Sequence, residues 1–279
     1  RPKRAGDGCR LVAARVPRDA PLPLRDMPAL RIERGERQAF SDAVIEEAPI
    51  ALLYNGVSHA VMMATPADLE DYALGYSLSE GIVEDPGELR YVEALDTGMG
   101  IVVEMLLPQA RFDRLHERRR AGVGASGCGL CGVESLQAAM RPAPPVPWGQ
   151  RSSAEAIVQG VHALAGAQDL NRRSGGVHAA GYVHDGGILV REDVGRHNAL
   201  DKLVGALRRG ERGDGFLVLS SRASYELVHK AACAGIGIVV AISAPTTLAI
   251  DLAQSSGITL VAFARGEQMN VYTHADRIA

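Results

Sequence analysis

The sequence predicts an α/β protein in which a small mixed domain precedes a larger domain built on a parallel sheet. In the last third of the chain, short apolar runs alternate with helical patterns of about ten residues, as in parallel sheets. Residues 30–107 instead mix hairpin and helix signals, which is typical of an α+β domain. Because 47% of the 279 residues are hydrophobic, the chain can bury a core in each part.

Four segments follow from the composition along the chain. Residues 1–28 are rich in Arg and Pro and lack periodicity, so we expect a flexible arm. Residues 29–112 form the small α+β domain. Residues 113–150 hold a basic, glycine-rich loop with a Cys-x-x-Cys pair and then a proline-rich connector. Residues 151–279 carry the clearest α/β pattern and form the larger domain.

In the small domain, the strongest local signal is Asn55-Gly56, a dipeptide typical of tight hairpin turns. Thr65 is expected to be the N-cap of a helix, because Pro66 and two acidic residues follow it. The expected elements are a strand and turn at 50–57, strands at 59–64, 90–95 and 100–107, and a helix from 65 to 81.

The larger domain shows a hairpin pattern around Asp185-Gly186, followed by buried strands and helices in alternation. The hairpin strands are expected at 179–184 and 187–192, the buried strands at 216–220, 238–243 and 258–263, and the helices at 154–165, 198–207, 224–234 and 246–254.

The cysteine pair lies within residues 127–132, where a glycine stands on both sides of each thiol. These glycines let the backbone turn sharply and let another molecule approach. Three arginines precede the pair and a short helical pattern follows, and both features favour the thiolate form of a cysteine. The alternative is half of a zinc site, but the second ligand pair that it needs is missing. The spacing therefore favours reactive thiols at Cys128 and Cys131, with no metal.

Polar residues follow the three buried strands, at Ser221-Arg222, at Thr246 and at 263–266. Ligands of open parallel sheets bind outside the carboxyl ends of the strands. Here two hydroxyl-rich turns lead into helix N-termini, which favour anions, and Arg222 and Arg265 can each bind phosphate. The alternative is that Ser224 and Thr246 only cap helices. The combination favours a phosphorylated ligand, although no Walker or G-x-G-x-x-G motif is present.

A densely charged turn, residues 191–198, lies between the second hairpin strand and the next helix. It could be an ordinary surface turn in which Asp193 or Asn198 caps the helix. We favour a position that lines the ligand site, because Gly195 permits close approach and His197 can transfer protons near neutral pH.

The composition argues against several other classes of protein. The net charge of −3 and the 4% of aromatic residues do not favour a nucleic-acid surface. We find no apolar run long enough to span a membrane and no signal peptide at the start. Four cysteines are too few for a disulfide scaffold, so we expect the cytoplasm.

Three motifs together resemble one family. Residues 127–132, residues 191–202 and the run from Ser220 to His274 are similar to the formate dehydrogenase accessory sulfurtransferases, the FdhD family. The resemblance covers the chain from about Leu30 onward. It implies a cytidine-deaminase-like three-layer sandwich with a smaller N-terminal α+β domain, usually as a homodimer. It further implies an enzyme, a sulfurtransferase, which takes persulfide sulfur from a cysteine desulfurase.

On this resemblance, the sulfur passes to the molybdenum of bis-(molybdopterin guanine dinucleotide) before that cofactor enters formate dehydrogenase. Cys128 would carry the persulfide and Cys131 would assist it. Sulfur could leave as sulfide when Cys131 attacks the inner sulfur, or could coordinate the metal directly. The residues implied to hold part of the guanine dinucleotide are Phe263, Ala264, Arg265, Gly266, Glu267 and Gln268.

Two rival functions are weighed against this one. A zinc deaminase needs H-x-E and P-C-x-x-C motifs, but Ala180 stands where the Glu should be and no Pro precedes Cys128. The second rival is a non-catalytic chaperone that binds the molybdenum cofactor and uses its cysteines only for redox sensing. Loading of a persulfide would separate the carrier from the chaperone.

Overall fold

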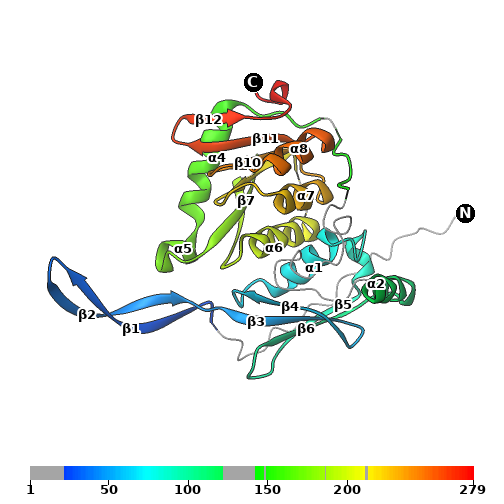
Figure 1. Ribbon diagram of the computed structural model, residues 1–279, viewed down its shortest axis with the longest axis horizontal. Helices are drawn as coiled ribbons and strands as arrows, with labels where there is room; N and C mark the ends of the chain where they lie inside the picture. The colour runs from blue at the N-terminus through cyan, green and yellow to red at the C-terminus, as the bar shows by residue number, and fades with distance from the viewer. Residues whose placement is uncertain (1–21, 122–141, 148, 186, 211–212) are drawn as a thin grey trace, which may run out of the picture.

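The computed structural model describes residues 22–121, 142–147, 149–185, 187–210 and 213–279. It contains two packed units, each with its own sheet, and a projecting ribbon (Figure 1). The mixed α/β class predicted from the sequence is therefore confirmed. Helices α1 and α6 lie between the two sheets, as Figure 1 shows.

The four-stranded sheet of the N-terminal unit has the strand order β4-β3-β6-β5. Asn55 and Gly56 both have positive φ and form the predicted tight turn between β3 and β4. Alternate residues of β3 are buried because α1 covers one face of this sheet. The elements are β3 (Ala48–Tyr54), β4 (Val57–Ala64), α1 (Leu69–Ser79), the 3₁₀ helix Pro86–Glu88, β5 (Tyr91–Asp96), β6 (Ile101–Leu106) and α2 (Gln109–Ala121).

Helix α1 begins at Leu69, so the prediction that Thr65 caps it was wrong. The N-cap is Asp68, at φ 53°. Thr65 is fully buried, and it accepts a hydrogen bond from the Val194 N–H at 3.1 Å through its hydroxyl oxygen. Its own N–H donates to the Asp193 carboxylate at 3.0 Å. Contacts with the second unit therefore override the local capping signal.

A two-stranded ribbon, β1 (Leu24–Glu33) and β2 (Glu36–Ile45), projects from the N-terminal unit (Figure 1). Its strands pair antiparallel without a bulge from end to end. Residues 24–28 therefore form strand, although we expected a flexible arm over 1–28; residues 1–21 lie outside the described part. Within the described residues, the body contacts the ribbon at its base, where Ile45 lies against Gly176 after α5.

The six-stranded sheet of the C-terminal unit has the order β12-β11-β10-β9-β7-β8. Strands β9, β10 and β11 are parallel, and β7 and β8 form the predicted hairpin. Strand β12, which the sequence analysis did not predict, pairs antiparallel with β11. The elements are α4 (Ala154–Ala167), α5 (Asp169–Ser174), β7 (His178–His184), β8 (Gly187–Asp193), α6 (Arg196–Arg209), β9 (Gly215–Leu219), α7 (Tyr225–Cys233), β10 (Ile238–Ala241), α8 (Thr247–Ser256), β11 (Thr259–Arg265), β12 (Gln268–Val271) and the 3₁₀ helix Ala275–Arg277.

Helices cover both faces of this larger sheet. Helices α6, α7 and α8 contribute to the core on one face, and α4 packs on the other. The central strands β9 and β10 are therefore buried on both sides, which explains their unbroken apolar sequences.

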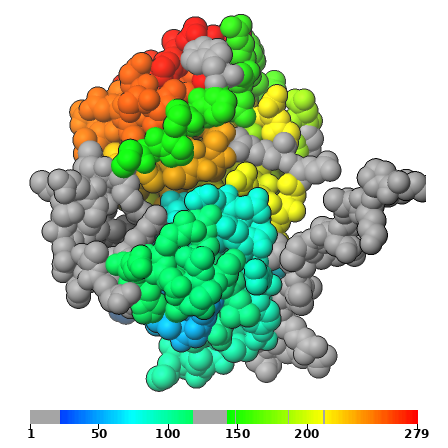
Figure 2. Space-filling model, turned by 90° about the vertical axis from the view of Figure 1, so that its right-hand side faces the viewer, coloured from blue at the N-terminus to red at the C-terminus, as the bar shows by residue number. Residues whose placement is uncertain are grey.

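The two units meet where α1 crosses α6, and the crossing depends on two glycines. A Cβ on Gly75 would lie 1.7 Å from the carbonyl oxygen of Asp201, and one on Gly205 would lie 1.9 Å from that of Asp71. Only glycine allows backbones to approach so closely. Figure 2 shows the result, with the N-terminal unit (blue to green) directly below the C-terminal unit.

Buried charges surround this crossing and tie the units together. The Lys202 ammonium lies 2.6 Å from the Asp193 carboxylate, with both side chains fully buried, and also donates to the Thr65 carbonyl at 2.9 Å. Asp71 of α1 pairs with Arg191 at 2.7 Å. Several residues of the charged stretch 191–198 therefore hold the junction between the units, whereas we expected this stretch to line the ligand site.

Candidate functional site at the carboxyl edge of the parallel strands

The carboxyl ends of β9, β10 and β11 lie at one edge of the larger sheet, because these strands pair in parallel and in register. The segments that follow them are cross-linked by backbone hydrogen bonds. Ala223 donates to Ala244 at 3.2 Å and accepts from Thr246 at 3.0 Å. Phe263 donates to Ser243 at 3.2 Å. This edge, which we call the polar rim, thus brings together the three segments singled out in the sequence.

Three hydroxyl groups of the rim are already engaged. Thr246 is the N-cap of α8, and its hydroxyl oxygen accepts from the Ala249 N–H at 3.2 Å. Ser224 stands at the N-cap position of α7, but its hydroxyl donates to the Glu226 carboxylate at 2.9 Å. The buried Ser221 donates to the Arg222 carbonyl. Thr246 therefore caps α8 with its side chain, whereas Ser224 holds the N-cap position of α7 without a capping hydrogen bond from its side chain.

The side chains that the rim presents to solvent come mainly from the segment after β9 and from the β11–β12 turn. Arg222 is exposed, and no ion pair joins it to any residue that the structure describes. Phe263 has φ 52° and is 40% exposed, so an aromatic ring faces outward at the end of β11. Arg265 is exposed and donates to the Ile242 carbonyl at 2.9 Å, which fixes its position.

The six residues expected to hold the guanine dinucleotide thus lie on one strand end and turn. Gly266, with φ 56°, makes the turn possible, and Glu267 and Gln268 are exposed beside it. Ala264 is only 3% exposed and faces the core, so its side chain is not available to a ligand. The remaining side chains are exposed and available to bind an anion or a flat aromatic ring.

His197 lies close to the rim, at the start of α6. Its Nε2 atom is 3.4 Å from the Glu226 carboxylate at the start of α7. The contact with His197, followed by that with Ser224, lowers the pKa of Glu226 to about 2. Within the charged stretch, His197 thus lies near the rim, whereas Asp193 and Asn198 contact the N-terminal unit at the junction.

Two further residues join this end of the sheet: His178, which was not expected at the site, and Arg196, which belongs to the charged stretch 191–198. His178 begins β7, and burial followed by the charge of Arg196 lowers its pKa. The Nε of Arg196 is buried and has no hydrogen-bond partner within the described part of the chain. The missing signal was the direction of β7: it runs antiparallel to β9, so its first residues meet the carboxyl end of β9.

Cys128 and Cys131 lie outside the described residues, so their expected roles stay predictions from the sequence. The connector that follows them is described from residue 142. Val146 is buried, and its N–H donates to the Ser256 carbonyl at 2.8 Å, at the C-terminal end of α8. Figure 2 shows the connector (bright green) lying across the orange surface of the C-terminal unit. The connector is thus anchored at the end of α8 opposite to the rim.

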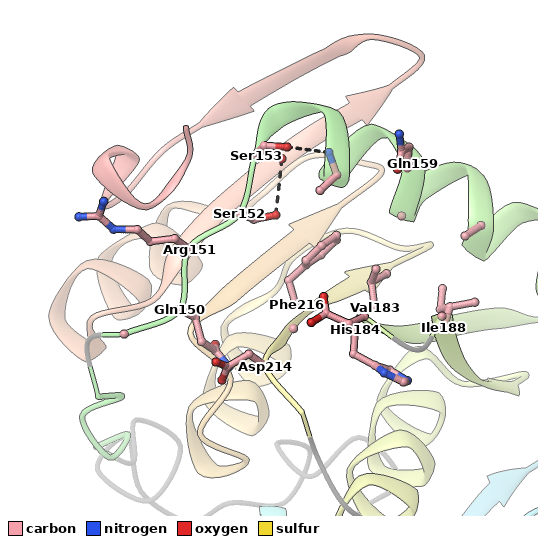
Figure 3. Close-up of a pocket in the computed structure, with 17 residues that line it drawn as sticks. Gln150, Arg151, Ser152, Ser153, Gln159, Val183, His184, Ile188, Asp214 and Phe216 are labelled. Carbon is pink, nitrogen blue, oxygen red and sulfur yellow. Dashed lines mark hydrogen bonds between the residues drawn. The ribbon is translucent and has the colours of Figure 1, made fainter.

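A pocket of about 610 Å³ opens at that opposite edge of the sheet. Figure 3 shows Phe216, Val183 and Ile188 on its strand side, with α4 above them. Gln150 and Asp214 lie at one end of the pocket, where β9 begins. No residue proposed for the ligand site lines this pocket, so it is separate from the rim.

Within the described residues, no group of three or more His, Cys, Asp or Glu side chains is arranged to hold a metal ion. Across the same part of the chain, none of the helices has the length and apolar character needed to cross a bilayer.

The fold and the rim define an α/β protein that presents arginines and an aromatic ring at the carboxyl ends of its parallel strands. The model of the FdhD/NarQ family matches residues 45–279, and the chain belongs to this family. That membership confirms the resemblance drawn from the three motifs.

Curated relatives and a solved structure agree with the assignment. A protein of Bordetella petrii named "Sulfur carrier protein FdhD" is 48% identical over 268 residues, which cover 92% of this chain and 96% of that protein. A protein of the same name from Xanthomonas campestris pv. campestris is 50% identical over 89% of this chain and 90% of its own length. The crystal structure of a candidate formate dehydrogenase accessory protein from Desulfotalea psychrophila superposes with a TM-score of 0.72 and 25% identity, covering 93% of this chain and all of that one.

Proposed function

We propose that the protein is a sulfur carrier, a persulfide-forming sulfurtransferase that prepares the molybdenum cofactor for formate dehydrogenase. The observation that carries the proposal is the set of relatives at 48% and 50% identity, each over about nine tenths of this chain, that are named sulfur carrier proteins. We place this activity in the cytoplasm, with a cysteine desulfurase as donor, formate dehydrogenase as recipient and a homodimer as the working form. We also keep the cytidine-deaminase-like assignment of the larger unit as a proposal.

In this proposal, Cys128 receives the sulfur. Its thiolate attacks the outer sulfur of the donor's persulfide, the donor's S–S bond breaks, and the donor cysteine leaves as a thiolate. The new Cys128 persulfide then gives up its outer sulfur. If Cys131 attacks the inner sulfur, sulfide leaves and a Cys128–Cys131 disulfide forms, which a thiol reductant must reopen.

The substrate, molybdenum bis-(molybdopterin guanine dinucleotide), fits the chemistry of the polar rim. It combines phosphate groups with flat guanine rings. Arg222 and Arg265 offer guanidinium groups to the phosphates, and the exposed ring of Phe263 offers a stacking surface to a base. Glu267 and Gln268 lie beside them as hydrogen-bonding groups.

The position of the connector is compatible with transfer to the rim. The connector is anchored at the C-terminal end of α8, and Thr246 marks the other end of that helix. A helix of this length spans about 15 Å. Cys131 lies eleven residues before Pro142, and eleven residues span about 16 Å even in a helix. The anchor therefore does not prevent the thiols from reaching the rim.

Persulfide loading tests the carrier role directly. The full chain is incubated with a cysteine desulfurase and cysteine, and its intact mass is measured with and without prior reduction. We expect one added sulfur atom that is lost in Cys128→Ser and retained in Cys233→Ser, a control at the half-buried cysteine of α7. Equal loading of Cys128→Ser would remove the carrier role and favour the chaperone alternative.

Thermal protection by guanosine diphosphate tests the rim separately. We expect the nucleotide to raise the melting temperature of the wild-type protein and to have little effect on Arg222→Ala. Arg222 suits this test because it makes no ion pair with the described residues, so its removal should leave the fold intact. If neither protein responds to the nucleotide, the rim does not bind the guanine dinucleotide.

A further inference from the structure

The β1–β2 ribbon exposes apolar side chains that the described part of its own subunit leaves uncovered. On one face, Leu30 pairs with Ala39 and Ile32 pairs with Arg37. Leu30 is 49% exposed and Ile32 is 64% exposed. An isolated two-stranded ribbon is marginally stable in water, so a ribbon of this length needs a surface to pack against.

The N-terminal unit offers such a surface on the face of its sheet turned away from α1. Val61, Ala51, Val102 and Leu95 are cross-strand partners and form an apolar row across all four strands. Val61 is 55% exposed and Leu95 is 43% exposed. We call this surface the outer face. Large apolar areas of this kind are typical of protein interfaces.

Two glutamates give the outer face a negative charge. Glu93 and Glu104 stand directly opposite each other on β5 and β6, in the row next to the apolar one. Like charges in this position destabilise a sheet. Glu93 accepts a hydrogen bond from Tyr91, but within the described residues neither carboxylate has a cationic partner. A cation from another molecule would relieve this repulsion.

The ribbon carries such a cation next to its exposed apolar residues. Arg37 lies on the same face as Leu30 and Ile32 and makes no ion pair with the described residues. Each strand of the ribbon is about 33 Å long, and a four-stranded sheet is about 14 Å wide, so a ribbon can cross the whole outer face. The apolar residues and the opposite charges thus match between ribbon and outer face.

We propose that the occupant of the outer face is the ribbon of a second copy of this chain, with Arg37 of one copy placed against Glu93 and Glu104 of the other. Exchange of two ribbons makes the same contact twice about a twofold axis, so the assembly closes at two subunits. The proposal specifies the surface of the homodimer named above, and it does not depend on sulfur transfer.

Light scattering after size exclusion, together with sedimentation at graded concentrations, tests the proposal on the full chain. We expect the wild-type protein at twice its mass of 29.6 kDa. Arg37→Glu and Glu104→Arg should each weaken the dimer by at least about a hundredfold, because like charges then meet in both contacts. Arg31→Glu, the same change on the opposite face of the ribbon, should leave the dimer intact and is the matched control.

The decisive experiment mixes the two single variants, Arg37→Glu and Glu104→Arg. In a mixed pair, one contact joins Glu at 37 to Arg at 104 and the other has the wild-type residues, so both contacts are complementary and the dimer should return. A wild-type monomer, dimers that tolerate all three variants, or a mixture that stays monomeric would each overturn the proposal. Circular dichroism of every variant excludes unfolding as the cause.

Discussion

Substitution of Gly205 by Ala tests how the two units are joined. The new Cβ would lie 1.9 Å from the carbonyl oxygen of Asp71, whereas real Cβ contacts essentially never fall below 3.0 Å. Helices α1 and α6 must therefore move apart by roughly 1 Å. Overpacking of this kind costs about 1–3 kcal/mol.

The same displacement breaks hydrogen bonds at the junction. The bond from Lys202 to the Thr65 carbonyl is 2.9 Å long, and that from the Thr65 N–H to Asp193 is 3.0 Å long. Stretching either one by roughly 1 Å takes it beyond bonding distance. With about 1 kcal/mol for each bond, we expect Gly205→Ala to lower the free energy of unfolding by about 3–5 kcal/mol.

Urea denaturation followed by circular dichroism measures this change. The matched control is Gly166→Ala on α4, where a Cβ would meet nothing within 4 Å. Because alanine favours a helix over glycine, the control should be neutral or stabilised by up to about 1 kcal/mol. If Gly205→Ala costs less than about 1 kcal/mol, the close crossing of α1 and α6 does not hold the units together.

Three further changes test individual contacts. Lys202→Met leaves the Asp193 carboxylate buried without its cation, and urea denaturation should show a loss of about 3–5 kcal/mol. Thr246→Ala removes the cap of α8 and should cost about 1 kcal/mol, seen as a melting temperature lower by about 2–4 °C. Because the pKa of Glu226 is lowered to about 2, its contribution to stability is complete above pH 4.5 and is lost as the pH falls towards 2. The difference in urea midpoint between wild type and Glu226→Gln should therefore shrink over that range, and a constant difference would contradict the low pKa.

Elements with purely local signals could be predicted from the sequence. Strands β9 and β10 are buried on both faces, so their apolar runs stood out, and the Asn55-Gly56 turn carried its own conformational preference. Because the sequence pattern of β9, β10 and β11 is that of parallel strands, the polar residues after them could be assigned to one edge. The rim segments could thus be located from local patterns together with one rule of sheet geometry.

Features that depend on contacts between distant segments could not be predicted. Thr65 and Pro66 form a good capping sequence, but Thr65 is buried against Asp193, more than a hundred residues away. The ribbon strand β1 mixes Arg, Pro and apolar residues with little alternation, so its first residues were assigned to a flexible arm. Only its register with β2 reveals which side chains share a face.

The charged stretch at the start of α6 connects the junction to the rim. Asp193 and Lys202 are buried between the units, while His197, between them in the sequence, contacts Glu226 at the rim. Both sets of contacts are carried on the first two turns of α6 and the residues just before it, so a shift of α6 moves both. A displacement of α6 by Gly205→Ala should thus weaken nucleotide protection at the rim as well as stability. A destabilising core substitution in the N-terminal sheet that touches neither set, such as Leu52→Ala, should lower stability but leave nucleotide protection unchanged. This contrast separates a coupled junction from general loss of stability.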